Sequence, residues 1–193
     1  MTKVLMVASG FSAKEVHDYD YKANGWTIVA INNGWMATDD WDLWVRTGDF
    51  DGKRPDVIKD NQKECVKYGE VLEKHFGGHK ECGYSITLCA SYYSLWKYKP
   101  DVMGFLGCDM NYTPDADGNT HIYGVGSDIK KRGIPDPDRM VEQYAKGNEN
   151  YLNDLYMRLV SEAESWSNCK VYNLSSVTDT RLPYNKAKPV DFQ

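Results

Sequence analysis

The stretch that decides the fold spans residues 100–126 and reads PDVMGFLGCDMNYTPDADGNTHIYGVG. It opens with a Pro-Asp turn, continues as an apolar run typical of a buried parallel strand, and breaks at Gly107 into a polar loop. That loop holds Asp109, Tyr112, Asp115, Asp117, Asn119, His121 and Tyr123. Because open α/β sheets bind ligands outside the carboxyl ends of their strands, we expect the functional site at this loop.

Three apolar runs that precede this stretch also end in small or polar residues. They span residues 3–8, 26–31 and 41–46, and they end at Ser9-Gly10, at Asn32-Asn33-Gly34 and at Thr47-Gly48-Asp49. Ser12 stands where it could cap a short helix, whose first N–H groups could approach a phosphate or carboxylate. The two asparagines could bind a ribose or a base, or could simply close their own turn. The repeated pattern favours one shared ligand edge.

Helical patterns alternate with these strands. A polar stretch over residues 56–76 ends at Gly77-Gly78, residues 83–98 form a buried helix, and residues 140–166 form a long helix with a break near Gly147. A Pro-Asp repeat over residues 135–138 marks the turn before the long helix, and residues 169–173 form a last strand. The alternation predicts one α/β, Rossmann-like domain over residues 1–193, with a mainly parallel sheet flanked by helices.

Composition narrows the classes of protein to consider. With a net charge of −5 and a pI near 5.4, a broad nucleic-acid surface is not favoured, although a local basic groove is compatible with this average. No apolar run approaches the ~20 residues that cross a bilayer, and the amino terminus reads as a strand, so we expect a cytoplasmic protein. The five cysteines show no CxxC pair and are expected to be reduced thiols. Fourteen tyrosines and six tryptophans suit stacking on rings or sugars, or simply filling a core.

The loop after Gly107 carries the residues best suited to chemistry. His121 is its only histidine, and histidine is the usual general base for activating a hydroxyl. Asp109 could steady a substrate hydroxyl, hold a metal or tie down its own loop. The run DADGN over residues 115–119 is similar to a calcium loop, but it lacks the closing glutamate, and a turn through Gly118 accounts for it better.

The order of these motifs resembles a known group of enzymes. VASGFS, AINNG, LGCDMNY, NTHIYGVGSD and VYNLSS follow one another as they do in the sialyltransferases of glycosyltransferase family 42. The order is also similar to the DUF115 group, which includes flagellin nonulosonate transferases and MptE-like pterin pyrophosphokinases. Those families begin with Gly-x-Gly-Pro-Ser, whereas Ser9 and Phe11 replace the first glycine and the proline here.

The resemblance implies a nucleotide pocket and a set of catalytic roles. The implied pocket residues are Ser9, Gly10, Ser12, Asn32 and Asn33, with Gly107 and Asp109 at its floor. His121 would deprotonate an acceptor hydroxyl, and Tyr112 and Tyr123 would stabilise the departing phosphate in place of a metal. The expected function is therefore that of a bacterial or viral glycosyltransferase with a nucleotide-sugar donor, CMP-linked in the sialyltransferase case, and a small-molecule or glycan acceptor.

Two alternatives stay open. One is a pyrophosphokinase that uses ATP and magnesium, in which Asp109 and Asp49 would bind the metal. The other is a nucleotide- or sugar-binding module without catalysis. A nucleic-acid acceptor is conceivable, but the acidic pI does not favour it. A homo-oligomer could form through exposed aromatic clusters around Trp35, Trp41 and Trp44.

Overall fold

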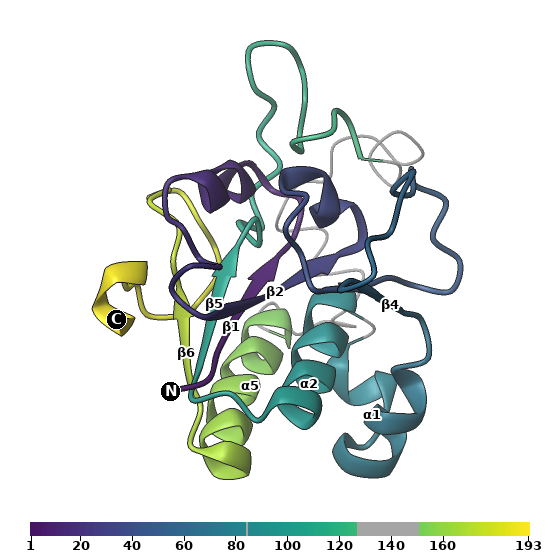
Figure 1. The fold of residues 1–193 in the computed structure, drawn as a ribbon, viewed down its shortest axis with the longest axis vertical. Coiled ribbons are helices and arrows are strands. Elements are labelled where there is room, and N and C mark those ends of the chain that lie inside the picture. Colours follow the sequence, from purple (N-terminus) through teal and green to yellow (C-terminus); the bar gives the residue numbers. More distant parts are fainter. Residues whose placement is uncertain (84, 127–150) are drawn as a thin grey trace.

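The computed structural model describes residues 1–83, 85–126 and 151–193, and these form one six-stranded sheet with helices packed against it (Figure 1). The strands are β1 (Lys3–Val7), β2 (Trp26–Ile31), β3 (Leu43–Val45), β4 (Lys63–Cys65), β5 (Val102–Leu106) and β6 (Lys170–Asn173). Their order is β4-β3-β2-β1-β5-β6, and every pair is parallel. This arrangement confirms the predicted α/β, Rossmann-like fold.

The strand order contains one reversal of direction. The chain steps outward from β1 to β4 and then returns to place β5 on the other side of β1. The strand order therefore reverses between the neighbouring strands β1 and β5. Such a switch point is the usual ligand crevice of an open α/β sheet.

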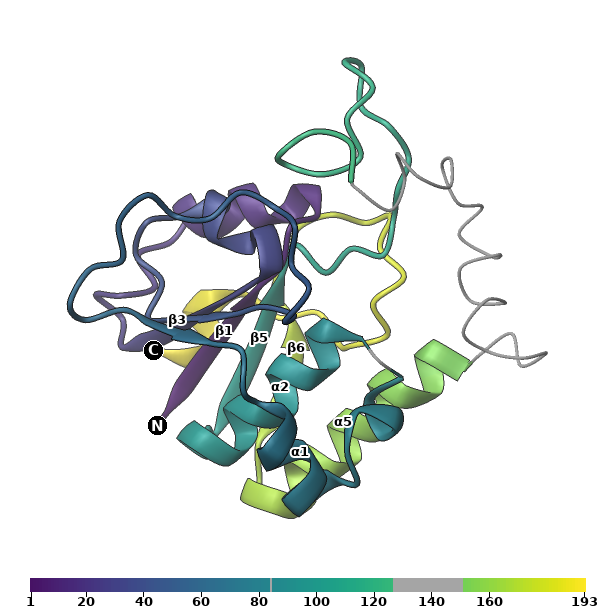
Figure 2. The same ribbon diagram turned by 90° about the vertical axis from the view of Figure 1, so that its right-hand side faces the viewer.

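The two faces of the sheet are covered differently. The helices α1 (Gly69–Phe76), α2 (Ile86–Tyr98) and α5 (Tyr151–Ser167) lie together on one side of the sheet (Figure 2). Among the described residues, short 3₁₀ helices form the other helical turns, namely η1 (Phe11–His17), η2 (Asn32–Ala37), η3 (His79–Cys82) and η4 (Pro189–Phe192). Since α2 leads into β5 and α5 into β6, both of these helices begin near the carboxyl edge of the sheet. Within the described ranges, no helix is both long and apolar enough to cross a membrane.

Alternation along the strands builds two cores. On β1, Val4 and Met6 belong to the core under the α-helices, whereas Leu5 and Val7 belong to the core on the opposite face. All five cysteines are free thiols, and four of them are buried. Burying both faces of every central strand excludes water from the sheet, which explains why these strands read as continuous apolar runs.

The prediction of an exposed aromatic cluster is wrong for two of its three tryptophans. Trp41 and Trp44 are 2% and 1% exposed, and both belong to the core on the face opposite the α-helices. Trp44 points beneath η2, where its indole N–H donates to the carbonyl of Asn32 at 2.6 Å. Only Trp35 is partly exposed.

The helix expected over residues 56–76 is also wrong in its first half. Lys63–Cys65 instead forms strand β4 along β3, and only Gly69–Phe76 is helical. Gly77 ends that helix in the left-handed conformation with a φ of 77°, as predicted. The turn expected over residues 135–138 and the first part of the long helix, residues 140–150, lie outside the described residues.

Candidate functional site

The carboxyl edge of β1 and β5 brings the first predicted motif and the central loop together. Val7 pairs with Leu106 at the ends of the two strands. Beyond that pair, the N–H of Ala8 donates to Leu106 at 2.9 Å, and the N–H of Gly10 donates to Gly107 at 2.7 Å. The turn after β1 therefore lies directly against the turn after β5.

A buried hydrogen-bond network, which we call the Ser12–Asp109 latch, locks these turns together. Ser12 and Asp109 are 1% and 5% exposed. The N–H of Ser12 donates to Asp109 Oδ2 at 2.9 Å, its hydroxyl donates to Asp109 Oδ1, and the hydroxyl oxygen accepts the N–H of Gly107 at 2.7 Å. Ser12 is thus not the helix cap that the sequence predicted. Gly10 occupies that position, without a side-chain bond.

Two glycines make this close approach possible. A Cβ atom on Gly10 would lie 2.6 Å from Asp109 Oδ2, and one on Gly107 would lie 2.5 Å from the carbonyl oxygen of Ala8. Gly107 also has a φ of 70°, a conformation that favours glycine. The space that a side chain on Gly10 would need is occupied by the Asp109 carboxylate.

The predicted residues after β2 and β3 lie farther along the same edge. Asn32 has a φ of 46°, and its side-chain oxygen accepts the N–H of Thr47 at 3.2 Å, so it joins the turn after β2 to the turn after β3. The side-chain oxygen of Asn33 lies 2.6 Å from the position of a Cβ on Gly52, which places Asn33 against the next loop. Asp49 is exposed. With β2 and β1 between β3 and β5, and neighbouring strands about 4.8 Å apart, the ends of β3 and β5 are roughly 14 Å apart.

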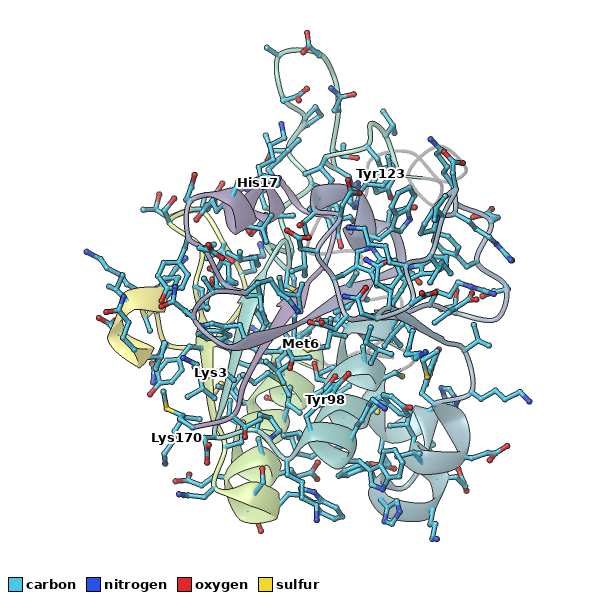
Figure 3. The ribbon with its side chains drawn as sticks, viewed as in Figure 1. Lys3, Met6, His17, Tyr98, Tyr123 and Lys170 are labelled. Atoms are coloured by element: carbon cyan, nitrogen blue, oxygen red, sulfur yellow. The ribbon has the colours of Figure 1, made fainter. Side chains whose placement is uncertain are left out.

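The other catalytic candidates form a small aromatic cluster around His121. Its ring stacks on Tyr123 at a centroid distance of 5.1 Å and contacts Tyr112 at 5.6 Å. The hydroxyl of Thr120, which is 1% exposed, lies 3.0 Å from His121 Nδ1. We call this set the His121 cluster. Figure 3 marks Tyr123 at the end of the molecule opposite Lys3 and Lys170, the first residues of β1 and β6.

A backbone bond attaches the His121 cluster to the switch point. The N–H of Ile122 donates to the carbonyl of Ser9 at 3.1 Å, and a tight turn returns the chain from His121 to Gly124. The structure therefore brings His121, Tyr112 and Tyr123 together beside the turn after β1. It leaves Asp49 apart from Asp109.

The loop between Asp109 and Thr120 contains a self-contained turn. The Asp115 carboxylate accepts the N–H groups of Asp117 at 3.0 Å and Asn119 at 2.8 Å, and the Asn119 bond lowers the pKa of this carboxyl. Gly118 sits in this turn with a φ of 78°. A turn through Gly118 therefore accounts for the DADGN run, as predicted.

Residues near the carboxyl terminus complete the edge, and the sequence analysis missed them. The carbonyl of Asp109 accepts the N–H of Arg181 at 3.0 Å and the hydroxyl of Thr180 at 3.2 Å. Lys186 Nζ donates to the carbonyls of Ser175 and Val177 at 2.6 and 2.8 Å, and desolvation lowers the pKa of this lysine. No motif marks these residues, because most of their partners are backbone atoms of distant or irregular segments.

At this edge, the residues that the structure describes provide hydrogen-bonded turns and a histidine. Within the described part of the chain, no group of three or more His, Cys, Asp or Glu side chains could hold a metal ion. The described residues therefore define a Rossmann-like α/β protein with a histidine and two tyrosines at its switch point. Comparison of the chain with protein-family models, curated proteins and solved structures found no match.

Proposed function

We propose that the protein is a transferase that uses a nucleotide-activated donor, in the simplest case a glycosyltransferase, with His121 as the general base. The observation that carries this proposal is the attachment of the His121 cluster to the turn after β1. The bond from Ile122 to Ser9 holds a histidine and two phenols where α/β enzymes bind ligands.

The proposed chemistry assigns one role to each member of the cluster. His121 accepts the proton of an acceptor hydroxyl while the hydroxyl oxygen forms a bond to the anomeric carbon of the donor. The bond from that carbon to the phosphate oxygen breaks, and the nucleotide leaves with the electron pair. The hydroxyls of Tyr112 and Tyr123 donate hydrogen bonds to the leaving phosphate. Thr120, 3.0 Å from Nδ1, orients the imidazole ring.

The remaining predicted residues divide into three groups under this proposal. Ser12, Gly107 and Asp109 hold the edge together through the latch, and Gly10 permits their approach. Asn33 and Asp49 are proposed to contact the ribose or base of the donor, since their side chains lie at the ends of β2 and β3. Backbone groups of Ser9 and Asn32 position these two regions.

The pyrophosphokinase alternative receives no specific support from the geometry. It requires Asp109 and Asp49 on one magnesium ion, whereas they follow strands whose ends are roughly 14 Å apart. Both oxygens of Asp109 also accept hydrogen bonds from Ser12. The alternative of a binding module without catalysis differs from our proposal only in turnover.

The test measures nucleotide binding and turnover on the same variants. Thermal shifts with CMP, UDP, GDP, ADP and ATP, each with and without magnesium, identify the nucleotide, because a ligand of the native state raises Tm. Consumption of the matching sugar nucleotide, with simple glycosides as acceptors, then measures transfer. We expect His121→Ala to lower transfer by about 10²- to 10⁴-fold while the nucleotide still binds. His17→Ala, a change of an exposed histidine on η1, is the matched control.

Three results would contradict the proposal. Equal loss of binding and transfer in His121→Ala would remove the base role. A shift only with ATP and magnesium would favour the pyrophosphokinase. Binding with no turnover of any donor would leave a binding module.

A further inference from the structure

The outer edge of the sheet at β4 is open in the part of the chain that the structure describes. On its inner side, the N–H of Lys63 donates to Asp42 at 2.9 Å, and the carbonyl of Cys65 accepts the N–H of Arg46 at 3.2 Å. Successive residues of a strand point their backbone groups to opposite sides, so the N–H and C=O of Glu64 point outward. An open strand edge of this kind can pair with another extended chain.

A surface depression lies beside β4, between this strand and α2. Its volume is about 380 Å³, and five consecutive residues, 63–67, line it together with Leu43, Tyr93 and Lys97. Because the lining runs along the strand, the depression fits an extended segment better than a compact ligand. Val66, which is 37% exposed, adds an apolar contact at one end.

The depression carries positive charge on an acidic protein. Lys63, Lys67 and Lys97 line it, and none of their ammonium groups forms an ion pair with a described residue. The one carboxylate of the lining, Glu64, pairs with Arg46 at 2.5 Å. The chain as a whole carries a net charge of −5, so this local excess of lysine points to an anionic partner.

We propose that the β4 edge binds an extended acidic segment of a partner protein, which adds to the sheet as a further parallel or antiparallel strand. Backbone groups of the partner pair with Glu64, and its acidic side chains meet Lys63, Lys67 and Lys97. A second copy of this chain fits less well, because pairing β4 with itself would bring the same lysines together.

The test uses a fluorescent peptide of about six residues, the usual length of a strand. Valine and glutamate alternate along this peptide. We expect its fluorescence anisotropy to rise with protein concentration and to fall as salt is added. The variant Lys63→Glu/Lys67→Glu should weaken binding about tenfold, and so should Lys97→Glu combined with Lys67→Glu. Lys74→Glu, on an exposed lysine of α1 outside the depression, is the matched control.

Two further measurements separate strand pairing from simple charge attraction. An N-methylated version of the peptide, which cannot pair along its backbone, should lose binding, and the amide of Glu64 should exchange hydrogen more slowly with the unmodified peptide. Equal binding of both peptides would overturn strand addition. Binding unaffected by the lysine reversals, or a protein that is a dimer through β4 in solution, would overturn the choice of partner.

Discussion

Replacing Ser12 by alanine tests whether the latch holds the carboxyl edge together. The change removes the hydrogen bond from the Ser12 hydroxyl to the Asp109 carboxylate, and bonds to charged groups contribute about 1.5–3 kcal/mol. It also leaves the N–H of Gly107 without its acceptor, at a cost of about 1–3 kcal/mol. We therefore expect the free energy of unfolding to fall by roughly 3 to 5 kcal/mol.

Urea denaturation followed by circular dichroism measures this change, and differential scanning calorimetry should show Tm lower by about 10 °C. Ser9→Ala is the matched control, because the Ser9 hydroxyl has no hydrogen-bond partner among the described residues and its change should fall within about 0.5 kcal/mol. A Ser12→Ala variant as stable as the parent would refute the latch. Loss of nucleotide affinity with unchanged stability would instead assign Ser12 to ligand binding.

Two further predictions concern a glycine and a tyrosine. Gly107→Ala should destabilise the protein by about 3 kcal/mol or more, because a Cβ would lie 2.5 Å from the carbonyl oxygen of Ala8 and the residue has a positive φ. Gly118→Ala, at a positive φ in open space, should cost only about 1 kcal/mol in the same urea experiment, and equal costs would contradict the packing argument. Desolvation raises the pKa of Tyr68 from 10.0 to about 12, so the folded state retains this proton where the unfolded state loses it. The contribution of the protonated Tyr68 hydroxyl to the free energy of unfolding is complete below pH 10 and is lost as the pH rises to about 12. Tyr68→Phe should therefore flatten the fall in stability between pH 10 and about pH 12.

The sequence located most of the sheet because burial leaves a local pattern. Residues 26–31 form a strand with the predicted bounds, and the other apolar runs each contain one. Strand β4 was missed, since Lys63–Cys65 lies at the sheet edge and carries no apolar run. Its strand conformation depends on pairing with β3, which no local pattern encodes.

The burial of the aromatic residues is a second feature that the local sequence pattern did not predict. Trp41 and Trp44 lie in a short run beside charged residues, and their number suggested a surface cluster. Packing against η2 and Phe50 buries Trp44, while Leu43 and Val45 of the same strand belong to the core under the α-helices, so both faces of this short strand are buried.

The sequence by itself determined that short polar segments follow the apolar strands. Because parallel strands bring their carboxyl ends to one edge of the sheet, these segments had to meet there. The tertiary structure decided what those residues do there. Ser12 and Asp109 are 97 positions apart, and only the pairing of β1 with β5 shows that their side chains satisfy each other. Local propensity could assign Ser12 only to the nearest helix start, since hydrogen-bond partners at such separation depend on the register of the whole sheet.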